Sequence, residues 1–278
     1  MNILSLFDGM SCGQIALEKA GIKVDNYFAS EIKKHAIEVT QHNYPETIQL
    51  GDVTKIKGKD LPKIDLLIGG SPCQDFSRAN KERKGLEGSK SSLFFEYVRL
   101  LEETKPKYFL LENVIMSDYN YWFICNELNC EPVRLCGSLV SGALRDRLYW
   151  TNIPPFSYDI TGRLISQIKQ PKDLKITLQS VLDSGVVKKR KHTSLNTTSG
   201  ADKYRSYKSL RHRNNTTGMI TLIYEDDYVR TVNQNELERL HNIPPGYTSI
   251  LNQKKAGDLI GDGWTVDIVK HIFKNINQ

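Results

Sequence analysis

Short apolar runs alternate with helix-like patterns along the first half of the chain. Apolar residues dominate at 3–7, 24–29, 47–50, 64–68 and 108–111, and the stretches between most of them carry apolar residues at helical spacing. The run at 64–68 is apolar apart from Asp65, which is typical of a strand buried on both faces. This repetition of strand and helix predicts an α/β fold, a doubly wound and mostly parallel sheet with helices on both faces.

The pattern weakens after Trp150. Pro154-Pro155 marks a boundary, and the following segment is richer in Lys, Ser, Thr and Asn. Helical spacing returns at 232–240 and at 266–276, and we expect the last helix to pack back on the first domain. We predict a large domain at 1–154, a smaller one at 155–254 and a returning segment at 255–278.

Polar residues follow every predicted strand, and they gather where a ligand crevice is expected. In parallel sheets that crevice lies outside the carboxyl ends of the strands. An acid about 20 residues after the first turn can accept hydrogen bonds from ribose, and a further acid can accept from an adenine amino group. The pattern favours an adenosine cofactor over ordinary turn acids. These strand-end groups are Asp8-Gly9, Glu31, Asp52, Ser71-Pro72-Cys73 and Glu112-Asn113.

The net charge of +6 is concentrated in one segment. Residues 186–215 contain nine basic residues and one acid, Asp202, so the rest of the chain carries a net charge of −2. Together with interleaved tyrosines, this pattern favours a surface that contacts nucleic-acid phosphates over a solvated loop. The basic residues are Lys188, Lys189, Arg190, Lys191, Lys203, Arg205, Lys208, Arg211 and Arg213.

The composition, 39% hydrophobic and 25% charged, is ordinary for a globular protein. We see no apolar stretch of about 18 residues and no signal-peptide pattern, so we expect a cytoplasmic protein without a membrane segment. The five cysteines form no Cys-x-x-Cys pair, which favours free thiols and no metal. A zinc site from Cys125, Cys130 and Cys136 is the weaker alternative, because their spacing is irregular.

Cys73 is the strongest candidate for catalysis. It follows Pro72 in a polar loop with basic residues nearby, conditions that favour an accessible thiolate. A buried structural cysteine, the commoner role, fits these polar neighbours poorly. The cysteine therefore predicts covalent chemistry at the sheet edge.

The motifs of the chain resemble those of the DNA cytosine-5 methyltransferases, and their residues are most similar to those of the animal de novo type. Residues 70–77 resemble the Pro-Cys-Gln-x-Phe-Ser signature, and 112–114 and 145–149 resemble the Glu-Asn-Val and Arg-x-Arg motifs. Residues 236–247 and 261–266 resemble the ninth and tenth motifs, although Asp262 stands where an Asn is common. The similarity covers both ends of the chain and leaves the middle segment unmatched.

The resemblance implies a Rossmann-like, S-adenosylmethionine-dependent fold with a target-recognition domain at 155–254. It implies that the enzyme flips a cytosine out of the duplex and that Cys73 adds to carbon 6. Glu112 would then face ring nitrogen 3, Arg147 the base carbonyl oxygen, and Arg145 the thiol or a phosphate.

The same resemblance assigns binding residues. It implies contacts to S-adenosylmethionine from Phe7, Asp8, Gly9, Ser11, Cys12, Glu31, Ile32, Asp52, Val53, Ser71, Leu93, Trp264 and Thr265. It adds Ser77 to the DNA-contacting residues of the basic segment. For Trp264, a plain core aromatic is the alternative, and for Glu112 with the two arginines a surface salt bridge.

The implied partner is double-stranded DNA, in a prokaryotic or phage setting, with a possible cognate restriction endonuclease. One alternative is an RNA cytosine-5 methyltransferase, because one branch of the family modifies transfer RNA. Another is a catalytically dead DNA-binding homologue, which the intact Cys73, Glu112, Arg145 and Arg147 disfavour. The sequence does not specify the recognised bases, a preference for hemimethylated sites or the oligomeric state.

Overall fold

A seven-stranded sheet forms the centre of the computed structural model, which describes residues 1–71, 92–195, 206, 208–212 and 220–276. The strand order is β3-β2-β1-β4-β5-β8-β7, and the first five of these strands run parallel. The strands are β1 (Asn2–Leu6), β2 (Asn26–Ser30), β3 (Ile48–Gln49), β4 (Leu66–Gly69), β5 (Tyr108–Val114), β7 (Val133–Cys136) and β8 (Asp146–Thr151). The predicted fold class is confirmed.

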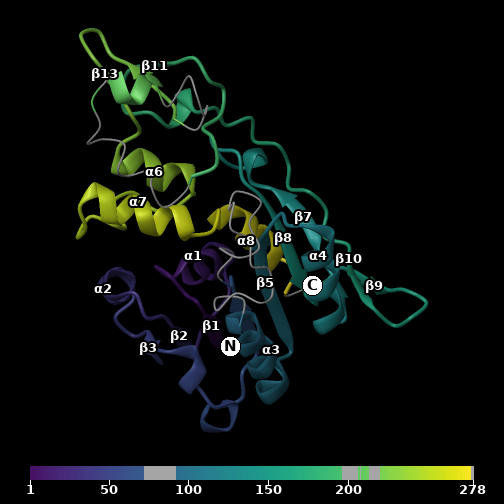
Figure 1. The fold of residues 1–278 in the computed structure, drawn as a ribbon. Coiled ribbons are helices and arrows are strands. Elements are labelled where there is room, and N and C mark those ends of the chain that lie inside the picture. Colours follow the sequence, from purple (N-terminus) through teal and green to yellow (C-terminus); the bar gives the residue numbers. More distant parts are fainter. Residues whose placement is uncertain (72–91, 196–205, 207, 213–219, 277–278) are drawn as a thin grey trace.

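Helices cover both faces of this sheet (Figure 1). One face carries α1 (Cys12–Lys19), α2 (Lys34–Asn43), α7 (Gln253–Asp262) and α8 (Val266–Phe273). The other face carries α3 (Ser92–Thr104) and α4 (Asp118–Glu127). The C-terminal α8 packs against α1, so the two ends of the chain lie side by side.

Side-chain alternation in the strands explains these two layers. Leu66 and Ile68 of β4 belong to the apolar cluster beneath α1 and α8, and Leu67 belongs to the cluster beneath α3. Successive side chains of a strand point to opposite faces, so a continuous apolar run is needed when both faces are covered. The prediction from the run at 64–68 is confirmed, because all residues of β4 are buried.

The strand order reverses between β1 and β4. From β1 the chain moves one way through α1, β2 and α2, and from β4 it moves the other way through α3 and β5. Such a reversal leaves a crevice between the loops that follow the two central strands. The loops after β1 and β4 therefore flank the expected ligand site.

The smaller part of the molecule holds a three-stranded sheet and α6 (Gln234–Leu240). The strands are β11 (Val186–Val187), β12 (Ile223–Tyr224) and β13 (Val229–Arg230), at the top of Figure 1. A third sheet joins β6 (Cys130–Glu131) to β9 (Phe156–Tyr158) and β10 (Leu164–Ser166).

The hairpin β9–β10 is attached to the large part of the molecule. Leu164 pairs with Cys130 of β6 and belongs to the same apolar cluster as Trp150 of β8. We therefore propose that the small domain begins after Ser166, slightly later than the boundary at residue 155.

We expect Ile68→Ala to lower the free energy of unfolding by about 2–5 kcal/mol, because it leaves a cavity at a side chain with no exposed surface. The matched control is Ile48→Ala in the edge strand β3, where the side chain is 41% exposed and the loss should be much smaller. Urea denaturation of both variants measures the difference. Equal losses would contradict this account of the core.

Candidate functional site

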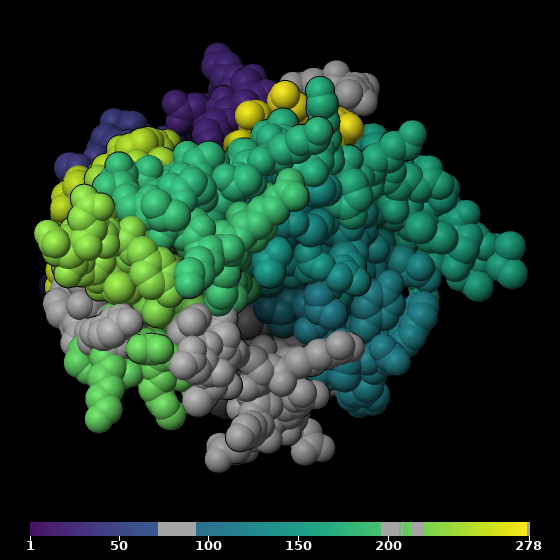
Figure 2. Space-filling model, turned by 90° about the horizontal axis from the view of Figure 1, so that it is seen from above, coloured from purple at the N-terminus to yellow at the C-terminus, as the bar shows by residue number. Residues whose placement is uncertain are grey.

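A cavity of about 390 Å³ opens at the carboxyl ends of β1, β2, β4 and β5. Its volume lies within the range of about 300–1,000 Å³ that small-molecule sites occupy. Seen from above, the surface is hollowed between the green and the blue-teal parts of the chain (Figure 2). The cavity therefore occupies the edge that the strand-end residues indicate.

Most of the predicted catalytic and cofactor-binding residues meet in this cavity. Ser11 and Thr265 are buried outside its lining, and Cys73 and Ser77 lie outside the described residues. The predicted residues that line it are Phe7, Asp8, Gly9, Cys12, Glu31, Ile32, Asp52, Val53, Ser71, Leu93, Glu112, Arg145, Arg147 and Trp264.

The loop after β1 is shaped by left-handed backbone and by one carboxyl group. Phe7, Gly9 and Ser11 have φ angles of 57°, 60° and 62°. Asp8 Oδ1 accepts hydrogen bonds from Ser5 Oγ at 2.6 Å and Tyr27 Oη at 2.7 Å, and Asp8 Oδ2 accepts one from Ser11 Oγ. Burial raises the pKa of Asp8 from 3.8 to about 6 despite these donors. Asp8 and Ser11 thus shape the loop, while Phe7 and Gly9 line the cavity.

Glu31 lies at the end of β2 and is fixed by backbone amides. Its Oε1 accepts from the N–H groups of Ile32 at 2.7 Å and Lys33 at 2.8 Å, and its Oε2 accepts from Gly9 at 2.8 Å. These bonds hold the turn that precedes α2, which begins at Lys34. The carboxylate joins the loops after β1 and β2 at the cavity wall.

Asp52 caps the short 3-10 helix Val53–Lys55. Its Oδ1 accepts hydrogen bonds from the backbone N–H of Thr54 at 3.0 Å and from the Thr54 hydroxyl at 2.9 Å. These bonds hold the pKa of Asp52 below its ordinary value, so the group is a carboxylate at neutral pH.

One ion pair at the cavity rim and a histidine–carboxylate contact near it were missed by sequence reasoning. Lys33 Nζ lies 2.5 Å from Asp262 Oδ2 at the end of α7, and both residues line the cavity. Beside it, His35 Nε2 lies 3.6 Å from Asp258 Oδ2. Both contacts join the start of α2 to α7, and Lys33 and Asp262 are 229 residues apart in the sequence.

Glu112 and Arg147 form the central ion pair of the site. Arg147 Nε lies 2.9 Å from Glu112 Oε1, and the two side chains are only 15% and 11% exposed. Glu112 Oε2 accepts a hydrogen bond from the indole Nε1–H of Trp264 at 3.2 Å. Both oxygens of this carboxyl therefore have a donor.

Antiparallel pairing brings these groups together. In the register of β5 and β8, Val114 lies opposite Arg147 and Glu112 lies opposite Tyr149. Because β8 runs against β5, its first residues reach the edge where β5 ends.

Arg145 is buried, and its guanidinium faces backbone carbonyl groups. Its Nη2 donates to the carbonyl oxygen of Gly263 at 2.7 Å and of Gly261 at 3.3 Å, and Nη1 donates to Leu195 at 3.2 Å. Burial, followed by the neighbouring Arg147 charge, lowers the pKa of Arg145 to about 10, so it remains protonated at neutral pH. The residue joins the small domain to the loop that carries Trp264.

Asn113 anchors the chain that leads to Cys73. Its Nδ2 donates to Ser71 Oγ at 3.1 Å and to the Ser71 carbonyl oxygen at 3.4 Å, and both residues are buried. Ser71, two residues before Cys73, is thereby held beside the end of β5.

Further lining residues were not assigned from the sequence, although several adjoin assigned ones. The glycines among them lack side chains and the others are recognisable only in three dimensions. They are Ser5, Gly13, Ser30, Lys33, Gly51, Gly70, Asn113, Val114, Leu259, Gly261, Asp262 and Gly263.

The basic segment is divided by the structure. Lys191 Nζ donates to the carbonyl oxygens of Ser138 at 2.6 Å, Ser141 at 2.7 Å and Ile176, which uses all three ammonium protons. Lys189 Nζ donates to Ile220 at 3.0 Å.

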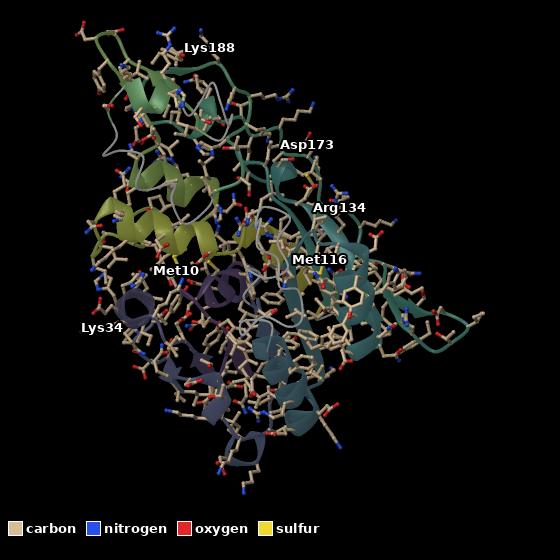
Figure 3. All side chains as sticks on the ribbon, in the orientation of Figure 1. Met10, Lys34, Met116, Arg134, Asp173 and Lys188 are labelled. Carbon is tan, nitrogen blue, oxygen red and sulfur yellow. The ribbon has the colours of Figure 1, made fainter. Side chains whose placement is uncertain are left out.

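The remaining cations that the structure describes are accessible. The exposed ones are Lys188, Arg190, Lys208 and Arg211. Lys188 lies at the outer end of the small domain (Figure 3), with its Nζ 5.2 Å from the centre of the Tyr224 ring. Lys203, Arg205 and Arg213 lie outside the described residues.

The described residues contain no group of three His, Cys, Asp or Glu side chains arranged to hold a metal ion. Cys125, Cys130 and Cys136 have free thiols. Among the helices in the described ranges, none has the length and apolar character needed to cross a membrane.

The fold is that of methyltransferases. The Entamoeba histolytica methyltransferase EhMeth superimposes with a TM-score of 0.72 at 16% identity, covering 99% of this chain and 97% of that one. A mutant of Spodoptera frugiperda DNMT2 gives 0.69 at 18% identity, covering 100% and 99%.

Sequence similarity points to one family among the methyltransferases. Residues 1–117 match the family described as C-5 cytosine-specific DNA methylase, which confirms the predicted resemblance over that part of the chain. The orphan methyltransferase M.SPRI of Bacillus phage SPR is 45% identical over 116 residues, 41% of this chain and 26% of that protein. The type II methyltransferase M.NgoBV of Neisseria gonorrhoeae is 43% identical over 118 residues, 41% and 28%. The matches thus span about a quarter of these relatives' length.

We expect Asp8→Asn to change how stability depends on pH. The folded pKa of about 6 exceeds the ordinary value of 3.8, so the folded protein binds more protons between about pH 4 and 6. The wild type should therefore lose stability as pH rises through this window, by about 2 kcal/mol, since each pKa unit corresponds to about 1.4 kcal/mol and Asp8 is partly exposed.

The asparagine variant should lack this component, so its stability relative to wild type should rise from pH 4 to 6 and then level off. Urea denaturation at several pH values measures the difference. Parallel curves would show that the Asp8 carboxyl has an ordinary pKa.

Proposed function

We propose that this protein is a DNA cytosine-5 methyltransferase that uses S-adenosylmethionine. The observation that carries the proposal is the Glu112–Arg147 pair, withdrawn from water in a cavity that also contains Glu31 and Asp52. The names of the relatives that match residues 1–117 support the same reaction.

The cavity fits the proposed cofactor. Glu31 and Asp52 offer carboxylate oxygens at the ends of β2 and β3, where hydroxyl and amino groups of an adenosine would be recognised. Phe7, Leu93 and Trp264 supply apolar surface for the remainder. S-adenosylmethionine supplies a methyl group on a positively charged sulfur, which a carbon nucleophile can attack.

The protein residues prepare the base for that attack. We propose that the Cys73 thiolate adds to carbon 6 of a flipped cytosine, which makes carbon 5 nucleophilic. Glu112, in its protonated form, would donate a hydrogen bond to ring nitrogen 3 and Arg147 would donate one to the carbonyl oxygen, so that the negative charge developing on the ring is stabilised by preorganised donors. After methyl transfer, loss of the proton at carbon 5 and elimination of Cys73 would release the product.

The position of Ser71 supports the role of Cys73. Asn113, which directly follows Glu112 in the chain, binds Ser71 and so holds it close to Glu112. Two further residues span at most about 7 Å, so the chain can deliver a thiol to the same cavity.

Arg145 has a different part in the proposal. Its three carbonyl partners favour a role in supporting the Trp264 loop over direct contact with a thiol or phosphate.

The small domain would bind the duplex through its exposed cations, with base recognition by side chains not yet identified. A cognate restriction endonuclease stays a proposal, because the similar proteins include both an orphan and a type II methyltransferase.

We expect duplex DNA with 5-fluorocytosine in its target to trap the protein covalently when S-adenosylmethionine is present. Fluorine at carbon 5 cannot leave as a proton would, so the Cys73 adduct persists. Cys73→Ser should abolish both the trapped species, seen by denaturing electrophoresis, and methylation, seen by bisulfite sequencing.

Cys136→Ser is the matched control, because Cys136 is partly exposed and lies outside the cavity lining. It should trap like the wild type. Methylation by the Cys73→Ser variant would refute the mechanism, and methyl incorporation into total RNA but not into DNA would assign the RNA alternative instead.

We expect Lys188→Ala with Arg190→Ala to weaken DNA binding and to flatten its salt dependence. Each lost phosphate contact should reduce the slope of log K against log salt by about 0.9, so the pair should reduce it by about 2. Lys191→Ala is the matched control, since its ammonium already serves three carbonyl groups and the slope should stay unchanged. Fluorescence anisotropy over a salt series measures both. A reduced slope for Lys191→Ala, with an unchanged slope for the double variant, would place the DNA-binding surface elsewhere.

A further inference from the structure

The indole of Trp264 belongs to two sites at once. Its ring lines the cavity on the side proposed for the cofactor, and its Nε1–H donates to Glu112 Oε2 at 3.2 Å. Trp264 and Glu112 are both buried, so water competes little for this bond. A residue expected only to pack against the cofactor thus also contacts the carboxyl expected to meet the base.

We propose that Trp264 is a positioning residue, whose indole N–H fixes the Glu112 carboxyl for catalysis. The proposal rests on the function proposed above. The terminal torsion of a glutamate is broad, so a single ion pair leaves the carboxyl free to rotate. With Arg147 on Oε1 and Trp264 on Oε2, the plane of the carboxyl is set before any base arrives.

Gly70 gives independent support for this contact. A Cβ at residue 70 would lie 3.0 Å from Trp264 Nε1 and 3.1 Å from Glu112 Oε2, closer than ordinary van der Waals contact. The backbone that leads to Ser71 therefore packs against both ends of the hydrogen bond. A side chain at residue 70 would therefore crowd both groups, whereas no positive φ angle demands glycine there.

The loop before α8 holds the indole in place. Arg145 Nη2 binds the carbonyl oxygens of Gly261 and Gly263, the residues just before Trp264. Thr265 is the N-cap residue of α8, whose apolar face packs into the core with α1. The N–H is thus aimed at Glu112 by a fixed backbone.

The first test uses Trp264→Phe, which keeps an aromatic ring and removes the N–H. Hydrogen bonds to charged groups contribute roughly 10- to 100-fold in equilibrium terms, so we expect a fall of that size in kcat. The Kd for S-adenosylhomocysteine should change by less than about threefold, because ring packing persists. Trp122→Phe on α4, where the side chain is 46% exposed, is the matched control and should leave kcat unchanged.

Two further variants separate positioning from packing. Gly70→Ala keeps the indole but crowds the bond, and should also lower kcat with little effect on cofactor affinity. In a Glu112→Gln background, Trp264→Phe should cause little additional loss, because the two residues act through one contact. An unchanged kcat with weakened cofactor binding, or fully independent losses, would overturn the proposal.

The last readout does not need activity. The chain has three tryptophans, so a proton–nitrogen correlation NMR spectrum should show three indole N–H signals, which Trp→Phe variants would assign. Glu112→Gln should shift the Trp264 signal and leave that of Trp122 in place. If the Trp264 signal did not move, the contact between Trp264 and Glu112 would be refuted. A wild type that binds no cofactor and methylates no DNA would refute only the proposed function.

Discussion

The arrangement of the site depends on one carboxyl group withdrawn from water. An unpaired buried carboxylate is costly, so Glu112 requires partners wherever the fold places it. Arg147 and Trp264 supply them, and they come from residues 35 and 152 positions further along the chain. Strand order, the direction of β8 and the return of the C-terminal segment all serve this requirement. The position of Glu112 and the fold therefore depend on each other.

The antiparallel direction of β8 brings one of these partners, Arg147, to Glu112. A parallel strand beside β5 would begin at the opposite edge of the sheet and would carry Arg147 away from the cavity. Because β8 is antiparallel, Arg147 lies opposite Val114, where β5 ends. The otherwise parallel sheet thus gains cations at an edge that already carries acids after β1, β2 and β3.

The sequence predicted the five parallel strands, the polar residues at their ends and much of the cavity lining, because these depend on local periodicity and on the strand-end rule; it did not predict the antiparallel β8. Glu31 and Asp52 lie where that rule put them. It could not show that Lys191 is consumed by three carbonyl groups, since the charge pattern of the basic segment treats every lysine alike. Nor could it pair Lys33 with Asp262, because that contact depends on how α2 and α7 pack.

The segment that matches the methylase family does not contain the whole site. Residues 1–117 provide the cavity floor, Glu112 and the loop before Cys73, but both partners of Glu112 lie beyond them. Packing of α8 against α1 brings the Trp264 loop over the amino-terminal half, and Arg145 links that loop to Leu195 in the small domain. A shift of the small domain would therefore reach the Glu112 carboxyl through Arg145 and Trp264.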